Sequence, residues 1–197
     1  QPIRINSDYL RLNFLDTESK RLSEKSTPEQ LAWLTKLPAI EFECADCKVS
    51  HYQLDKVSAS LLGDGKKLLI SELVVDKGDH ILRTKGQWQN GLTAMSGELK
   101  SDDIGALFNE FDITTTIKDS NANLNYQLNW QAAPYDLDIA SLDGEISWDL
   151  GEGHLTEISD GGARVFSLLS LDSLVRKLKL DFRDVFSKGF FYNSMQG

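Results

Sequence analysis

The sequence predicts a mainly β protein with a few short helices, in which most of the chain forms a long, curved antiparallel meander. Apolar and polar residues alternate without a slip over residues 121–131 and again over 142–150, as in strands with one dry and one wet face. Turn signals, among them Gly63-Asp64-Gly65 and Asn90-Gly91, separate the alternating segments. Helical spacing is confined to short stretches near 27–36, 102–110 and 163–179.

The first part of the chain predicts a strand, a linker and a short helix. Apolar residues alternate with polar ones over residues 9–15, and a charged, serine-rich stretch follows. Thr27-Pro28 then begins a helix that Pro38 ends. We treat 1–36 as this N-terminal part and 37–197 as one structural domain, and we expect the chain to be a piece of a longer protein.

The remaining segments predict consecutive hairpins with one internal helix. Ser101-Asp102-Asp103 caps that helix, whose apolar positions include Ile104 and Leu107. One expected strand begins near residue 40. The others cover 57–61, 68–75, 81–88, 92–99, 121–131, 142–150 and 153–158.

The apolar stripes of these strands are expected to face one side of one sheet, and that side needs a cover. Eight strands at about 4.8 Å spacing make a sheet nearly 40 Å across, whereas a helix covers a strip only about 10 Å wide. Either the sheet closes on itself, or it stays an open trough filled by helices and a ligand. The pattern alone leaves both arrangements open.

Composition excludes several function classes. The 197 residues carry a net charge of -9, which argues against nucleic-acid binding because phosphate contacts need a basic surface. The sequence contains no run of about 18 apolar residues, so we expect any membrane contact through regions outside this chain.

The chemistry-bearing residues do not form a catalytic pattern. His51, His80 and His154 lie far apart, and the aspartates near 136–143 lack the spacing of a calcium loop. We therefore predict no catalytic residue, no metal and no cofactor. Cys44 and Cys47 lack the second ligand pair of a zinc site, and both a local disulfide and two free thiols fit their spacing.

The segment 160–197 contains the longest helical signal, in which Leu171, Leu174, Val175 and Leu178 share one face. It resembles the C-terminal part of the AsmA-like, YhdP-type envelope proteins, with a Gly-Gly-x-Arg turn, a leucine-rich helix and a Leu-Asp-Phe-x-Asp-x-Phe-x-Lys-Gly-Phe run. The matching positions are Gly161, Gly162, Arg164, Leu168 to Leu171, Leu174, Leu180 to Phe182, Asp184, Phe186 and Lys188 to Phe190. Weaker matches follow in order at Gly86 to Trp88, Gly97 to Gly105, Leu128 to Trp130 and Leu142 to Gly144, so the resemblance covers about Leu37 to Gly197.

The resemblance implies a function, because similar proteins form apolar β grooves that bridge the two membranes of Gram-negative bacteria and move phospholipids. It implies a non-enzymatic periplasmic segment of a protein anchored in the inner membrane, which supports outer-membrane integrity. Phospholipid acyl chains are the expected partners, together with other envelope proteins. The alternative is a closed β-sandwich-like module that binds an envelope protein or a glycan.

The expected groove residues lie on the strands with the cleanest alternation and on the last helix, which we predict to pack inside the groove as a plug. They are Leu124, Tyr126, Leu128, Trp130, Leu142, Ile146, Trp148, Leu171, Leu174 and Leu178.

Overall fold

A computed structural model describes residues 1–12, 27–113, 115–155 and 190–197. The chain divides into two compact units, which are described separately below. Unit 1 comprises Gln1–Glu98 and Tyr126–Glu145, and unit 2 comprises Leu99–Asn125 and Ile146–Gly197. The division into an N-terminal part and one domain therefore stays a prediction.

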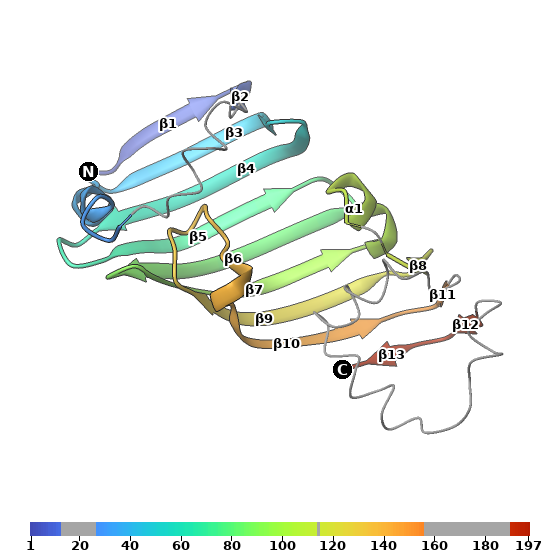
Figure 1. Cartoon of the computed structure of the whole chain (residues 1–197). Coiled ribbons are helices and arrows are strands. Elements are labelled where there is room, and N and C mark those ends of the chain that lie inside the picture. The colour runs from blue at the N-terminus through green and yellow to red at the C-terminus, as the bar shows by residue number, and fades with distance from the viewer. Residues whose placement is uncertain (13–26, 114, 156–189) are drawn as a thin grey trace. The chain divides into compact units, whose positions relative to one another are not determined.

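The described residues form strands and three short helical elements (Figure 1). The strands are β1 (Ile3–Ser7), β2 (Leu10–Leu12), β3 (Ile40–Val49), β4 (Tyr52–Gly63), β5 (Leu68–Asp76), β6 (His80–Gln89), β7 (Leu92–Ser101), β8 (Ile117–Lys118), β9 (Ala122–Trp130), β10 (Asp143–Leu150), β11 (Gly153–Leu155), β12 (Phe190–Tyr192) and β13 (Met195–Gln196). The helical elements are η2 (Ala32–Lys36), α1 (Ile104–Glu110) and η3 (Ile139–Ser141).

Most of the described strands belong to one long sheet in the order β1-β3-β4-β5-β6-β7-β9-β10-β13, with β2 also paired to β3. The sheet does not close into a barrel. Short turns connect β3 to β7 as consecutive hairpins, and Asn90 (φ 52°) with Gly91 (φ 84°) has the two positive φ angles of a type I′ turn. The mainly β class and the long antiparallel meander are confirmed.

Strands β1, β2 and β11 differ from the expected single meander. β1 pairs with β3 in parallel, Ile3 opposite Ile40, although the alternation near it predicted only a strand at residues 9–15. β2, which lies within that predicted strand, also pairs with β3 in parallel. β11, predicted as the next strand of the same sheet, lies in a second sheet with β8 and β12. The edge of β10 is occupied by β13, where Leu150 pairs with Met195, so β11 finds its partners elsewhere.

The helices follow local signals. Thr27 and Gln30 form a reciprocal capping box: the Thr27 backbone N–H donates to Gln30 Oε1 at 2.9 Å, and the Gln30 N–H donates to Thr27 Oγ1 at 3.4 Å. The helix that follows is the short 3₁₀ helix η2 rather than the longer helix expected. In a 3₁₀ helix residues i and i+3 lie on the same side, as Leu31 and Leu34 do here. The cap of α1 is confirmed, since Asp103 accepts from the Ala106 N–H. The helix predicted over 163–179 lies outside the described residues.

Each unit has its own core. In unit 1, Leu31 and Leu34 cover a cluster formed by Leu68, Ile70, Trp88 and Ala133. In unit 2, α1 covers a second cluster. Its buried members are Ile104, Leu107, Ile117, Ala122, Leu124, Trp148, Leu150, Leu155 and Tyr192.

Candidate functional site

The most extended apolar surface of unit 1 consists of three rows of side chains that run across the strands. Residues directly opposite each other on paired strands share a face, so the register defines each row. The first row is Ile3, Ile40, Leu61 and Ile70; the second is Ile5, Phe42, Ala59 and Leu73; the third is Cys44, Val57, Val75 and Leu82. We call these three rows the apolar face.

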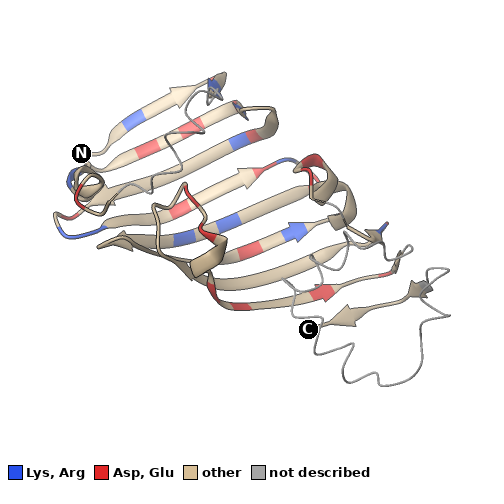
Figure 2. Cartoon of the chain, viewed as in Figure 1, with Lys and Arg blue, Asp and Glu red and all other residues tan. Residues whose placement is uncertain are grey.

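The other face of the same strands is polar. Arg4 Nε lies 2.8 Å from Glu41 Oε2, and Arg83 lies 3.7 Å from Glu98, in each case across neighbouring strands. Basic and acidic residues are interspersed along the strands (Figure 2). The sheet of unit 1 therefore has one wet face, and the apolar face is the one that needs a cover.

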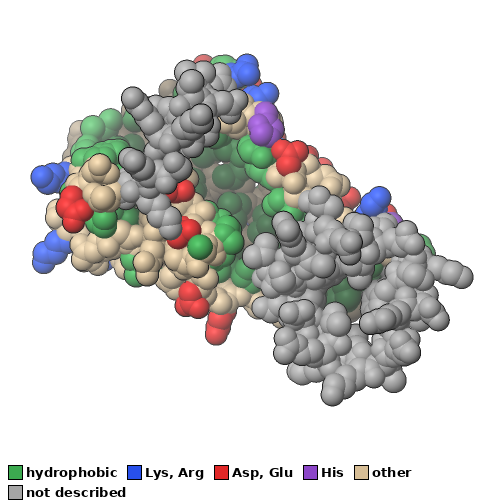
Figure 3. All heavy atoms as spheres, in the orientation of Figure 1, with side chains coloured by type: hydrophobic (Ala, Val, Ile, Leu, Met, Phe, Trp, Pro, Cys, Tyr) green, Lys and Arg blue, Asp and Glu red, His purple; other side chains and the backbone are tan. Residues whose placement is uncertain are grey.

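The cover of the apolar face is incomplete. Every aliphatic side chain of the second and third rows is only partly buried, and Ile5, at the end of the second row, is 43% exposed. Hydrophobic side chains gather in a hollow over the middle of β4, β5 and β6 (Figure 3). Contiguous apolar surface that stays partly exposed is typical of a binding face.

One end of the apolar face is closed by η2. Leu31 and Leu34 are 6% and 5% exposed and pack with Leu61 and Ile70 of the first row. Two backbone hydrogen bonds hold this segment: Gly63 N–H donates to Leu37 O at 2.9 Å, and Gly65 N–H donates to Thr35 O at 2.8 Å. η2 thus covers the end of the first row at Leu61 and Ile70, whereas Ile3 at the other end is 51% exposed. The open part consists of that exposed end and of the second and third rows.

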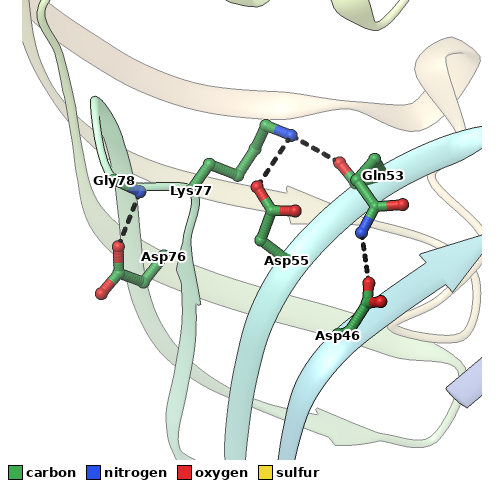
Figure 4. A network of polar contacts seen from close by, with 6 residues as sticks. All are labelled: Asp46, Gln53, Asp55, Asp76, Lys77 and Gly78. Carbon is green, nitrogen blue, oxygen red and sulfur yellow. Dashed lines mark hydrogen bonds and ion pairs between the residues drawn. The ribbon is translucent and has the colours of Figure 1, made fainter. Parts of the chain in front are cut away.

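A polar network lies one step beyond the third row, where β5 turns into β6 (Figure 4). The Lys77 ammonium, on a side chain only 8% exposed, donates to Gln53 O at 2.7 Å and lies 3.6 Å from Asp55. Gln53 in turn donates to Asp46 at 2.6 Å. A buried ammonium is costly unless it is paired, and these contacts supply the pairing. The apolar face therefore ends at this network, where Asp55 offsets the charge of the Lys77 ammonium.

The apolar face meets two hydroxyl groups, on β6 and β9, which lie next to Gly97 of β7. A Cβ added at Gly97 would lie 2.8 Å from Thr84 Cα and 2.9 Å from the Tyr126 hydroxyl, so the bare glycine gives Tyr126 room to lie across β7. Burial raises the pKa of the Tyr126 phenol, and its hydrogen bond with Thr84 opposes that rise. Thr84 also donates to Ser96 O at 3.1 Å, so these hydroxyls are satisfied within the protein.

Cys44 and Cys47 form a disulfide within β3, with their Cα atoms 5.9 Å apart. The sequence left this pairing open. The register of β3 on β4 shifts between the two cysteines, so the intervening bulge brings both side chains together. Both cysteines are buried, and Cys44 is part of the third row.

The predicted groove residues are distributed over both units. In unit 1, Tyr126, Leu128 and Leu142 are partly buried, and Trp130 is buried with its indole N–H donating to Ala133 O at 3.1 Å. In unit 2, Leu124 and Trp148 belong to the buried cluster under α1, and Ile146 packs against it. Leu171, Leu174 and Leu178 lie outside the described residues. Their role in lipid passage stays a prediction.

The rows on β3, β4 and β5 were not predicted as site residues, although the same alternation was present there. A β-bulge in β5 obscures part of the apolar–polar alternation. Ser60 pairs with Glu72 while Leu61 pairs with Ile70, so Ser71 is an extra residue that shifts the alternation of β5 by one position. Cross-strand rows also depend on register, which turn lengths and bulges determine.

The family model described as "YhdP protein" matches residues 1–197. The chain belongs to the YhdP family. It is 34% identical over 164 residues to the intermembrane phospholipid transporter YhdP of Escherichia coli (strain K12), a match that covers 81% of the chain. The same match covers 13% of that relative's length. No solved structure matches the chain.

Among the residues that the structure describes, no helix is long and apolar enough to cross a membrane. Within the same residues, no three His, Cys, Asp or Glu side chains come together as a metal site.

Proposed function

We propose that the chain is a non-enzymatic segment of a periplasmic bridge, and that its apolar face carries phospholipid acyl chains between the inner and the outer membrane. The observation that supports this proposal is the set of three apolar rows in unit 1, two of them only partly covered. Anchoring of the whole protein in the inner membrane and support of outer-membrane integrity belong to the same proposal.

The dimensions and chemistry of the face suit an acyl chain. The second row crosses five strands from Ile5 to Thr84, which at about 4.8 Å per step is roughly 19 Å. Thr84, which pairs with Leu73 and extends the row onto β6, donates to a backbone carbonyl, so it presents no unsatisfied donor to a hydrocarbon. Transfer of acyl methylenes from water to such a surface is favourable by about 0.8 kcal/mol per CH₂ that becomes buried.

Val75 and Val74 offer a matched test, because they are neighbours on β5 that point to opposite faces. Val75 lies in the third row between Val57 and Leu82, whereas Val74 lies on the polar face between Ser58 and Arg83. Both are partly buried. We expect Val75→Asp in the full-length protein to reduce the phospholipid that copurifies and to weaken the outer-membrane barrier, since it places a charge among acyl chains.

The control is Val74→Asp, which makes the same change beside Arg83 and should leave both readouts unchanged. Circular dichroism and a melting curve must first show that both variants are folded. If folded Val75→Asp protein carries as much phospholipid as folded Val74→Asp protein, the apolar face does not carry the lipid. Mass spectrometry of extracted lipid measures the first readout, and detergent sensitivity of the cells measures the second.

Other envelope proteins stay a predicted class of partner. The alternative, a closed β-sandwich-like module that binds an envelope protein or a glycan, also stays a prediction, although the long sheet of the described residues does not close into a barrel.

A further inference from the structure

A second surface of unit 1 also has the features of a binding site. A depression of about 420 Å³ lies over β5, β6, β7 and β9, within the size range of small-molecule sites. The side chains used in the argument below are Lys85, Gln87, Ala94, Ser96, Gln127 and Asn129.

The depression lies on the polar face, opposite the apolar rows. Lys85 and Gln87 alternate on β6 with Thr84 and Gly86, which pair with Leu73 and Ile70 of the apolar face. Successive side chains of a strand point to opposite faces, so Lys85 and Gln87 point away from the apolar face. A ligand in this depression is therefore separate from the proposed lipid path.

Short side chains on β7 create the hollow. A Cβ added at Gly86 would lie 3.0 Å from Met95 Cα, and one at Gly97 would lie 2.8 Å from Thr84 Cα. This register puts Ser96 beside Lys85, and Ala94 beside Gln87. The small side chains of β7 thus form a floor between longer polar side chains on β6 and on β9.

Several polar groups that line the depression are available to a ligand. In the described part of the chain, the side chains of Lys85, Ser96, Gln127 and Asn129 have no hydrogen-bond or ion-pair partner. Gln87 Oε1 accepts from Lys67 Nζ at 3.0 Å, which leaves the Gln87 amide N–H groups as donors. The lining residues include no Asp or Glu, although the protein has a net charge of -9.

We propose that this depression binds a saccharide that carries acetamido groups and a carboxylate. One ammonium without an opposing carboxylate complements a single negative charge. Side-chain amides supply both donors and acceptors, which the hydroxyl and acetamido groups of a sugar can pair at the same time. The proposal stands on the polar face alone and is independent of lipid passage.

The test uses two matched disaccharides. N-acetylglucosaminyl-N-acetylmuramic acid carries the carboxylate, and N,N′-diacetylchitobiose has the same acetamido sugars without it. We expect the acidic disaccharide to shift the backbone amide NMR signals of Ala94, Ser96, Gln127 and Asn129 with a Kd near the millimolar range. The uncharged disaccharide should bind about tenfold more weakly, because it lacks the charge-assisted contact.

Lys85→Met provides the decisive comparison. It should weaken the acidic disaccharide about tenfold and leave the uncharged one unchanged, since only the first has a carboxylate for the ammonium. Lys56→Met is the control, because Lys56 is also exposed on the polar face but lies on β4.

Three results would overturn the proposal. The first is the absence of shifts at these amides with the acidic disaccharide. The second is an equal effect of Lys56→Met and Lys85→Met on the affinity for the acidic disaccharide. The third is full displacement of the disaccharide by an equal concentration of inorganic phosphate, which would mean a simple anion site.

Discussion

Gly97 determines how Tyr126 lies on the apolar face. Without a side chain at that position, the phenol ring can cross β7 and its hydroxyl can reach Thr84. The phenol becomes partly buried as a result, and burial disfavours its charged form. A single absent Cβ therefore affects both the shape of the face and the acidity of one residue.

The raised pKa of Tyr126 predicts a loss of stability at high pH. The folded phenol holds its proton above the ordinary value of 10.0, so the unfolded chain releases a proton first as pH rises. The free energy of unfolding should therefore be fully retained below about pH 9 and fall as pH rises through 10. Urea unfolding at a series of pH values measures this.

Tyr126→Phe is the comparison, and it should lose less stability over the same pH range. Part of the loss should persist in that variant, because burial also raises the pKa of Tyr192. An identical loss in both proteins would show that Tyr126 ionises equally well in the folded and unfolded states.

Residue-level predictions succeeded where local chemistry alone decides the structure. Asn90-Gly91 adopts the predicted turn because both residues tolerate positive φ, and Asp103 caps α1 because its oxygen reaches the Ala106 N–H. The state of Cys44 and Cys47 could not be predicted in this way. Their pairing depends on a bulge in β3, which only the register with β4 reveals.

At the scale of elements, η2 covers the end of the first apolar row at Leu61 and Ile70. Leu34 is 5% exposed in the cluster with Ile70 and Trp88. We expect Leu34→Ala to lower the free energy of unfolding by about 2–4 kcal/mol through the cavity that it leaves. The variant should also increase the fluorescence of a solvatochromic dye. The dye binds exposed apolar surface, and η2 would pack less tightly on the first row.

Trp33→Ala is the control on the same helix. Trp33 is 55% exposed, so its removal should lower the free energy of unfolding less than Leu34→Ala does. Equal destabilisation by the two variants would mean that η2 does not cover the apolar face through Leu34.

Elements with an uninterrupted period were predictable, and those defined by distant pairing were not. β9 and β10 occupy nearly the predicted ranges because their alternation has no slip. β1 was not predicted because its partner β3 is distant in sequence. β11 was assigned to the wrong sheet because β13 occupies the edge of β10, and β11 pairs with β8 instead. The apolar face could not be predicted for the same reason, since its rows cross several strands and depend on the register between them.

At the scale of the whole molecule, the net charge of -9 opposes contact with anionic membranes. We expect the chain to sediment less with phosphatidylglycerol vesicles than with phosphatidylcholine vesicles at low salt. Salt should reduce the difference, because the screening length shortens to about 10 Å at 0.1 M. Stronger sedimentation with the anionic vesicles would show that a basic surface governs membrane contact.

The parallel pairing of β1 with β3 makes chain entropy unequal along the sheet. Short turns join β3, β4, β5, β6 and β7, whereas residues 8–39 separate β1 from its partner. Closure of a loop about eight times longer costs about 2 kcal/mol more, at roughly 0.6 kcal/mol per doubling. The β1 ladder must offset this cost with five paired residues, so it contributes less net free energy per hydrogen bond than the hairpins do. The β1 edge is thus less costly to detach from the long sheet than any of the hairpin strands β4, β5 and β6 is.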